Sequence, residues 1–116
     1  MERFEGTSRT YSPKASIWKR GQIGLNNDVL KKFKIKKDKK NWYVICFYSR
    51  ERHLIGFQFT QDSSKKGIIK ISFRPGGATL SVKSFLDYYS IDRSENRRYD
   101  ITYEKKLKMY VIDLKS

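Results

Sequence analysis

The stretch Lys14–Gly21 (KASIWKRG) recurs in weaker form as Lys70–Gly77 (KISFRPGG), 56 residues further along the chain. The same offset runs without a gap through both halves of the sequence. Identity is low, but apolar residues share positions at Val29 and Phe85, Leu30 and Leu86, Phe33 and Tyr89, Ile35 and Ile91, Tyr43 and Tyr99, and Ile45 and Ile101. A unit this small cannot bury its own apolar face, so two copies must pack together. The sequence therefore predicts a chain built as an internal dimer.

Length and composition indicate one folded domain. The 116 residues include eight Tyr, seven Phe and two Trp, enough to form a core, and disordered chains are poor in such residues. We expect a flexible segment over 1–13, followed by one domain over 14–116 that consists of two repeats, 14–60 and 70–115. The single cysteine, Cys46, excludes an internal disulfide and is typical of a reducing compartment. No long apolar run or leader is evident, so we expect a cytoplasmic or nucleoid-associated protein.

Positive charge is the strongest indication of function. The formal net charge is +14, and both halves are basic, with +9 over residues 1–60 and +5 over residues 61–116. Such a field attracts polyanions, by long-range steering and by release of counterions from nucleic acid. The alternative is a basic surface that serves only solubility. No basic amphipathic helix of useful length is evident, so we expect no membrane partner.

Each half predicts the same order of elements: strand, glycine turn, short strand, short helix and β-hairpin. In the first half, strands are expected over 15–19 and 23–25, a helix capped by Asn26 or Asn27, and a hairpin over 42–60. In the second half, the expected elements are strands over 67–73 and 78–80, a helix capped by Ser81, and a hairpin over 98–114. The predicted fold class is α+β, a β-rich pseudo-twofold barrel made from two β-β-α-β-hairpin units with short helices.

Apolar side chains on these elements are the candidate core. We expect Phe33 and Tyr89 on the inner faces of the two helices. In the strand over 42–48, burial of one face favours Tyr43, Ile45 and Phe47 as core residues.

The stretch Gly21–Ile35 resembles the core motif of AbrB-type transcription factors. In that superfamily a glycine turn leads into a short strand, then into an acidic-flanked short helix with a basic pair, and then into a hairpin. The resemblance covers roughly 14–60 and, more faintly, 70–115. Two such units in one chain are similar to the MraZ-like branch. The resemblance implies a swapped-hairpin barrel with interleaved units, which binds duplex DNA through a basic face.

The chain departs from the family pattern at several positions. Asn26 stands where the family usually has proline, and Gln22 and Ala78 stand where it has arginine. Of the basic pair on the helix, Lys31 matches by position, whereas Leu30 takes the other place. The helix of the second unit has Leu86 and Asp87 at these positions and is not basic.

The candidate nucleic-acid contacts are basic residues at the ends of the expected elements. The densest run, Lys36-Lys37-Asp38-Lys39-Lys40, lies in a loop held at both ends, where lysines can follow a phosphate backbone; a merely solvated loop is the alternative. A pseudo-twofold axis would place like charges symmetrically, which suits duplex DNA. By this symmetry, the candidate contacts also include Arg97 and Arg98 in the second half, and Lys19, Arg20 and Arg74 near the glycine turns. The family resemblance adds Lys31.

Two other functions stay open. Trp18, Trp42 and Tyr48 are interleaved with basic residues and, if exposed, would stack single-stranded bases, as in coactivators of the positive-cofactor type. The basic face could instead dock on an acidic protein, as in an antitoxin or an inhibitor. The sequence leaves the oligomeric state open.

Catalytic and metal-binding patterns are not evident. His53 and Cys46 could form a metal pair, but zinc normally takes at least three protein ligands, so a structural role is favoured for both. No Ser/His/Asp arrangement, phosphate-binding glycine loop or carboxylate cluster stands out. We therefore expect neither an enzyme nor a bound metal or cofactor.

Overall fold

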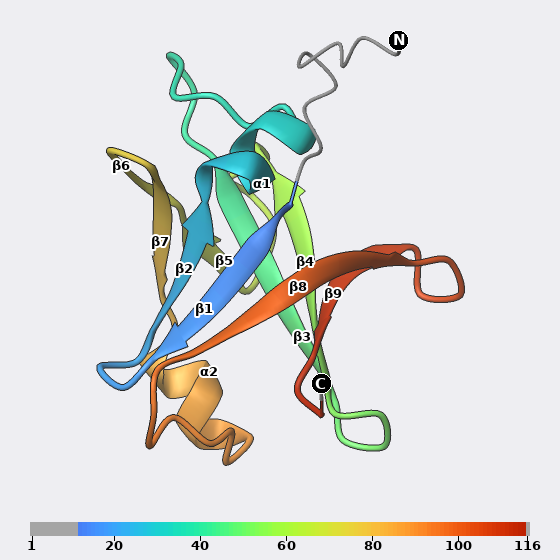
Figure 1. The fold of residues 1–116 in the computed structure, drawn as a ribbon. Helices are drawn as coiled ribbons and strands as arrows, with labels where there is room; N and C mark the ends of the chain where they lie inside the picture. The colour runs from blue at the N-terminus through green and yellow to red at the C-terminus, as the bar shows by residue number, and fades with distance from the viewer. Residues whose placement is uncertain (1–11, 116) are drawn as a thin grey trace, which may run out of the picture.

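A computed structural model describes residues 12–115, so the segment expected to be flexible, 1–13, lies outside the described residues except for its last two positions. The described residues form nine strands and two short helices (Figure 1). The first half contains β1 (Lys14–Trp18), β2 (Gln22–Asn26), α1 (Asn27–Lys32), β3 (Tyr43–Ser49) and β4 (Leu54–Thr60). The second half contains β5 (Ile68–Lys70), β6 (Ser72–Arg74), β7 (Gly77–Ser81), α2 (Lys83–Tyr88), β8 (Arg97–Glu104) and β9 (Met109–Asp113).

The strands form one antiparallel sheet that nearly closes into a barrel. Its order is β5-β3-β4-β9-β8-β1-β2-β7-β6, which leaves β5 and β6 at the two edges. These edge strands are consecutive in the chain and are separated only by Ile71. The Ile71 amide donates to the carbonyl of Trp42 at 2.9 Å, and its side chain is 2% exposed. Residues 68–74 therefore close the barrel, first pairing with β3 and then with β7. The β-rich barrel with short helices is confirmed.

Strands of the two halves alternate around this barrel. The hairpin β3-β4 lies between β5 and β9, and the hairpin β1-β2 lies between β8 and β7. The strands of one half therefore do not form a continuous sheet that could enclose a core by themselves. The core is accordingly shared, with fully buried side chains from both halves: Ile17, Ile23, Val29, Val44, Ile55, Phe57, Ile71, Leu80, Leu86 and Ile112. Burial of this common core stabilises the two halves together.

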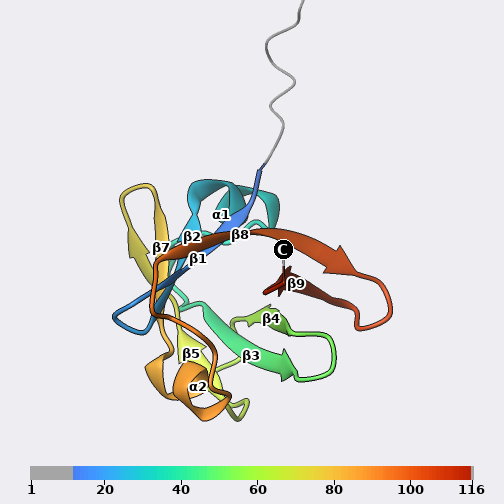
Figure 2. The same cartoon turned by 60° about the horizontal axis from the view of Figure 1, so that its bottom comes forward.

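The two helices lie at opposite ends of the barrel and end in the same way (Figures 1 and 2). The amides of Ile35 and Ile91 each donate at 2.8 Å to the carbonyl five residues earlier. The residue before each of them is left-handed, with φ of 56° at Lys34 and 53° at Ser90. These corresponding positions are 56 residues apart, which is the offset found in the sequence.

The helices begin differently. Asn26 caps α1 as expected, with its side chain accepting from the amide of Val29 at 3.2 Å. The expected cap of α2, Ser81, is wrong: the N-cap is Val82, which has no side chain able to bond the helix. Val82 holds this position because its side chain is buried in the core and its amide donates to the carbonyl of Gly21 at 3.0 Å.

Strand β3 presents the opposite face from the one expected. Val44 is fully buried, whereas Phe47 is 42% exposed, so the prediction that Tyr43, Ile45 and Phe47 form the core face is wrong. Val44 and Cys46 pair with Phe59 and Phe57 of β4, and this register turns the even-numbered residues inward. An uninterrupted apolar run has no alternation from which the buried face could be chosen.

Both aromatic residues at the helix ends pack against the core while staying half-buried. The Phe33 ring lies 3.9 Å from that of Tyr110 and 5.7 Å from that of Phe59, measured between centroids. The Tyr89 ring lies 4.8 Å from that of Tyr48. Each helix is thus held to the barrel by aromatic contacts at its C-terminal end.

Within residues 12–115, the helices are too short and too polar for any of them to cross a membrane.

Barrel closure at Ile71 can be tested by truncation. Replacing Ile71 with Ala removes a buried side chain where the strand changes partners, and it should lower the free energy of unfolding by about 2–5 kcal/mol. The matched control is Ser72→Ala at the neighbouring exposed position, which should change stability by less than about 0.5 kcal/mol. Urea denaturation followed by circular dichroism measures both. Equal stability of the two variants would show that Ile71 does not close the barrel.

Candidate nucleic-acid interface

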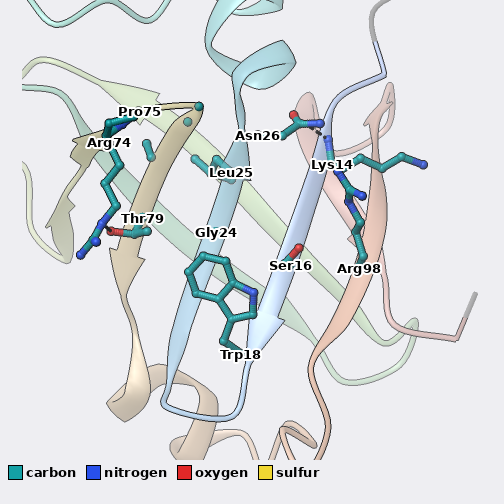
Figure 3. Close-up of a pocket in the computed structure, with 13 residues that line it drawn as sticks. Lys14, Ser16, Trp18, Gly24, Leu25, Asn26, Arg74, Pro75, Thr79 and Arg98 are labelled. Carbon is teal, nitrogen blue, oxygen red and sulfur yellow. Dashed lines mark hydrogen bonds between the residues drawn. The ribbon is translucent and has the colours of Figure 1, made fainter.

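A shallow groove of about 310 Å³ crosses the outer face of the sheet over β1, β2 and β7 (Figure 3). Arg74 lies along one side, and Lys14 and Arg98 lie along the other. The indole of Trp18 lies across the floor between them. These side chains point outward because alternate residues of β1, such as Ala15 and Ile17, occupy the core. The groove therefore has basic flanks and an aromatic floor.

Trp18 lies flat because Gly24, on the adjacent strand, has no side chain. A Cβ at Gly24 would come within 2.4 Å of the Trp18 ring, so any larger residue would displace the indole. The guanidinium of Arg20 also lies over the ring, 4.6 Å from its centroid, and its Nε donates to Gln22 at 2.7 Å. Packing on Gly24 and the Arg20 guanidinium thus both restrict the stacking of a base on this indole.

The cations on the two flanks have different partners. Arg74 donates through Nε to the hydroxyl of Thr79 at 3.3 Å, which leaves the far side of its guanidinium for a ligand. Lys14 forms an ion pair with Asp100. Arg98 is exposed and forms no ion pair within the described residues. Arg74 and Arg98 are therefore the two groove cations able to hold an anion.

A second group of cations lies at the α1 end. All five lysines predicted there are exposed, and none forms an ion pair with a carboxylate of residues 12–115: Lys31, Lys36, Lys37, Lys39 and Lys40. The acidic residue within the run, Asp38, instead holds the loop. It accepts from the amide of Lys40 at 2.9 Å and from the side chain of Gln61 at 3.3 Å. The loop is thus tied to the end of β4 while its lysines stay in solvent.

The fold adds cations that sequence reasoning missed. A cavity at the same end is lined by Lys32 and Lys34 from α1 and its C-terminal turn, and by Lys108 from the start of β9. Lys105 and Lys106 are exposed in the turn between β8 and β9. A pair of lysines at a hairpin tip was visible in the sequence, but nothing in the sequence placed that tip beside α1.

The remaining predicted residues lie at the α2 end. Lys19 and Arg20 occupy the turn between β1 and β2, where the Lys19 amide donates to Asn96 at 2.9 Å. Arg97 begins β8 and lies 3.7 Å from Glu95. The guanidinium of Arg93 lies 3.0 Å from Asp87, and this hydrogen bond lowers the pKa of the Asp87 carboxyl below its ordinary value. Ion pairs therefore offset part of the positive charge at this end.

The ten predicted residues thus divide into three places. Lys31 and the four loop lysines gather at the α1 end, Arg74 and Arg98 flank the groove, and Lys19, Arg20 and Arg97 lie near α2. Asn26, the cap of α1, lines the groove, and the next residue, Asn27, lines a hollow together with Lys31, Lys36 and Lys37, so the groove reaches the N-terminal end of α1. We call the two groove arginines and the five lysines at the α1 end the α1 surface.

The lone cysteine and histidine do not lie in a metal-binding cluster. No group of three or more His, Cys, Asp or Glu side chains within residues 12–115 is placed to hold a metal ion. Burial raises the pKa of the Cys46 thiol to about 12, which keeps it protonated and unreactive at neutral pH. The Nδ1 atom of His53 lies 3.4 Å from the hydroxyl of Tyr48.

Comparison with protein-family models, with curated proteins and with solved structures finds no match to this chain. Geometry and charge of the described residues are therefore the basis on which a function can be proposed.

The seating of Trp18 on Gly24 can be tested by Gly24→Ala in a protein that also carries Trp42→Phe, so that Trp18 is the one fluorophore of its kind. The added methyl should lift the indole from the sheet and shift its emission to longer wavelength. Gly56→Ala is the control, because the atom it would meet is the flexible Sδ of Met109 rather than a ring. An unchanged Trp18 spectrum in Gly24→Ala would contradict this geometry.

Proposed function

We propose that this protein binds nucleic acid, most favourably duplex DNA, as a small transcriptional regulator or architectural protein. One observation carries the proposal: the lysines of α1 and the following loop are exposed and unpaired within the described residues, whereas arginines at the α2 end engage carboxylates. Unpaired cations on one face release counterions when they meet phosphates, and this release supplies sequence-independent affinity.

The proposed duplication supports this function. The alternation of strands from the two halves and the matching ends of α1 and α2 are what two interleaved pseudo-twofold units require. They are also what the resemblance to AbrB-type and MraZ-like factors implies. The charges at the two ends, however, have diverged. We therefore propose that one face, the α1 surface, makes most of the contact with DNA, instead of two equivalent faces on a palindrome.

The chemistry of the side chains favours affinity over sequence reading. Lysine ammonium groups are mobile point charges that suit phosphate oxygens, whereas bidentate reading of a guanine edge favours arginine. The two groove arginines, Arg74 and Arg98, are the candidates for contacts with base edges. The loop lysines position the duplex, and the arginines supply whatever selectivity exists.

The two rival functions differ in the support that they have. Stacking of single-stranded bases on Trp18 is disfavoured, because the indole packs on Gly24 and the Arg20 guanidinium lies over its ring. Docking on an acidic protein is supported by exposed apolar residues near lysines of the β8–β9 turn, such as Tyr103 and Leu107. Binding measurements with nucleic acid at moderate salt separate this second rival from the proposal.

The main test changes the four loop lysines, Lys36, Lys37, Lys39 and Lys40, to Gln. We expect this variant to lose affinity for duplex DNA, and to lose about the same amount for unrelated sequences, because phosphate contacts carry no sequence information. The slope of log affinity against log salt should flatten by up to about 0.9 for each phosphate of B-form DNA that the variant no longer neutralises. Fluorescence anisotropy with labelled duplexes at several salt concentrations measures both quantities.

The matched control removes the same charge elsewhere, by changing Lys65, Lys66, Lys83 and Lys115 to Gln. These lysines are exposed and lie near α2 or the hairpin turn opposite α1. The control should bind more tightly than the loop variant and should retain more of the wild-type salt slope. If both variants lose the same affinity, binding depends on net charge alone; if wild type fails to bind any nucleic acid, the proposed function is wrong.

A further inference from the structure

A cavity of about 420 Å³ opens at the α1 end between α1, β4 and β9. Its wall is aromatic: Phe33, Trp42, Phe59 and Tyr110 line it, and each keeps part of its surface exposed. Phe59 and Tyr110 come from β4 and β9, whereas Phe33 follows α1 and Trp42 precedes β3. The volume lies within the range of small-molecule sites, about 300–1,000 Å³.

The rim of this cavity is cationic. Lys32, Lys34 and Lys108 line it and are exposed, and none forms an ion pair with a carboxylate of residues 12–115. No Asp or Glu of the described residues contributes to the lining. An aromatic wall beside uncompensated ammonium groups fits a ligand that has a flat aromatic part and an anionic part.

The equivalent turns at the other end of the barrel provide an internal comparison. Lys34 and Lys108 are left-handed, with φ of 56° and 51°. Ser90, in the turn after α2, and His53, in the turn before β4, are left-handed with φ of 53°. Ser90 and His53 also line a hollow, of about 230 Å³, together with Asp92 and Arg97. Residues with a hydroxyl or an imidazole side chain therefore adopt the same backbone conformation. The backbone does not demand lysine at these positions, since left-handed residues favour Asn, Asp and Gly.

Trp42 adds a polar group without a partner. Its Nε1 atom is buried and has no hydrogen-bond acceptor among the described residues. A buried donor without an acceptor costs free energy, so packing against the core, and not a hydrogen bond from the indole, holds the Trp42 side chain in the cavity wall.

We infer that this cavity binds one nucleotide, with the base against the aromatic wall and the phosphate between Lys34 and Lys108. The nucleotide is either free or an unpaired unit of a nucleic-acid strand, since both present the same base and phosphate. This site is separate from the phosphate contacts of the loop lysines proposed above, so it can fail or succeed independently of duplex binding.

The test uses full-length Trp18→Phe protein, in which the emission of Trp42 reports on the cavity. Titration with deoxyadenosine monophosphate should change the emission in a saturable way. Deoxyadenosine, which lacks the phosphate, should bind at least tenfold more weakly, and inorganic phosphate should leave the emission unchanged. Absence of a saturable change with the monophosphate would overturn the inference.

The source of the nucleotide is distinguished with polymers. A pentamer of deoxyadenosine that changes Trp42 emission at lower concentration than the monophosphate would identify an unpaired strand unit. A pentamer that acts no more strongly than the monophosphate would identify a free nucleotide. A blunt duplex that binds by anisotropy without changing Trp42 emission would place duplex contacts outside the cavity, and this result tests the proposed function separately.

The substituted residues are ones that the protein has at its other left-handed turns. Lys34→Ser with Lys108→His gives the cavity the residues found at the equivalent turns, Ser90 and His53, and it should weaken binding of the monophosphate at least tenfold. Lys66→Ser with Lys83→His removes the same charge near α2 and should retain binding. Urea denaturation of both variants checks that each is folded. Equal affinity of the two variants for the monophosphate would overturn the role of Lys34 and Lys108.

Discussion

The fold depends on a change of partner within one short segment. Up to Lys70 the chain pairs with β3, and from Ser72 it pairs with β7, so that residues 68–74 join the two edges of the sheet. Ile71, between them, points into the core and donates its amide to Trp42. An open nine-stranded sheet would leave two rows of unpaired backbone groups, which invite association with other chains. The change of partner at Ile71 leaves only two three-residue strands, β5 and β6, at the edges. The hydrogen bond from Ile71 also holds the backbone of Trp42, whose side chain lines the aromatic cavity.

Interleaving makes each glycine turn a contact between the two halves. A Cβ at Gly77 would lie 2.1 Å from the carbonyl oxygen of Leu25, and one at Gly21 would lie 2.6 Å from the Cβ of Lys83. Each turn therefore approaches an element of the opposite half too closely for a side chain. The glycine that aligns between the repeats in sequence is thus explained by packing, and the groove beside Arg74 follows from the close approach of β7 to β2.

Structure could be predicted from the sequence where residues follow a regular pattern, and it could not be predicted where such a pattern is absent. Both helices, the cap at Asn26 and the other strands followed from alternation, spacing and capping chemistry. The single strand expected over 67–73 is wrong: it is two strands, β5 and β6, because the chain changes pairing partner at Ile71. The buried face of β3 could not be predicted, because Trp42 through Tyr48 is apolar almost throughout and pairing with β4 decided the orientation. The cap at Ser81 failed because burial of Val82 outweighed a side-chain hydrogen bond. At the candidate site, the loop lysines were evident as a run, whereas Lys108, far along the chain, lies in one cavity with Lys32 and Lys34 only because of the barrel.

The two halves are similar in backbone geometry but differ in surface charge. The helix ends, left-handed turns and strand order correspond, because a shared core tolerates few changes in the path of the chain. Solvent-exposed positions carry no such constraint, and there the halves differ: lysines follow α1, whereas carboxylates in and after α2 pair with Arg93 and Arg97. Exposed ion pairs of this kind contribute little to stability, about 0–1 kcal/mol. Their principal effect is on the distribution of charge, since they offset part of the positive charge near α2, whereas the lysines that follow α1 form no ion pair within residues 12–115. This difference is the reason that the proposed contact with a polyanion is assigned to the α1 surface.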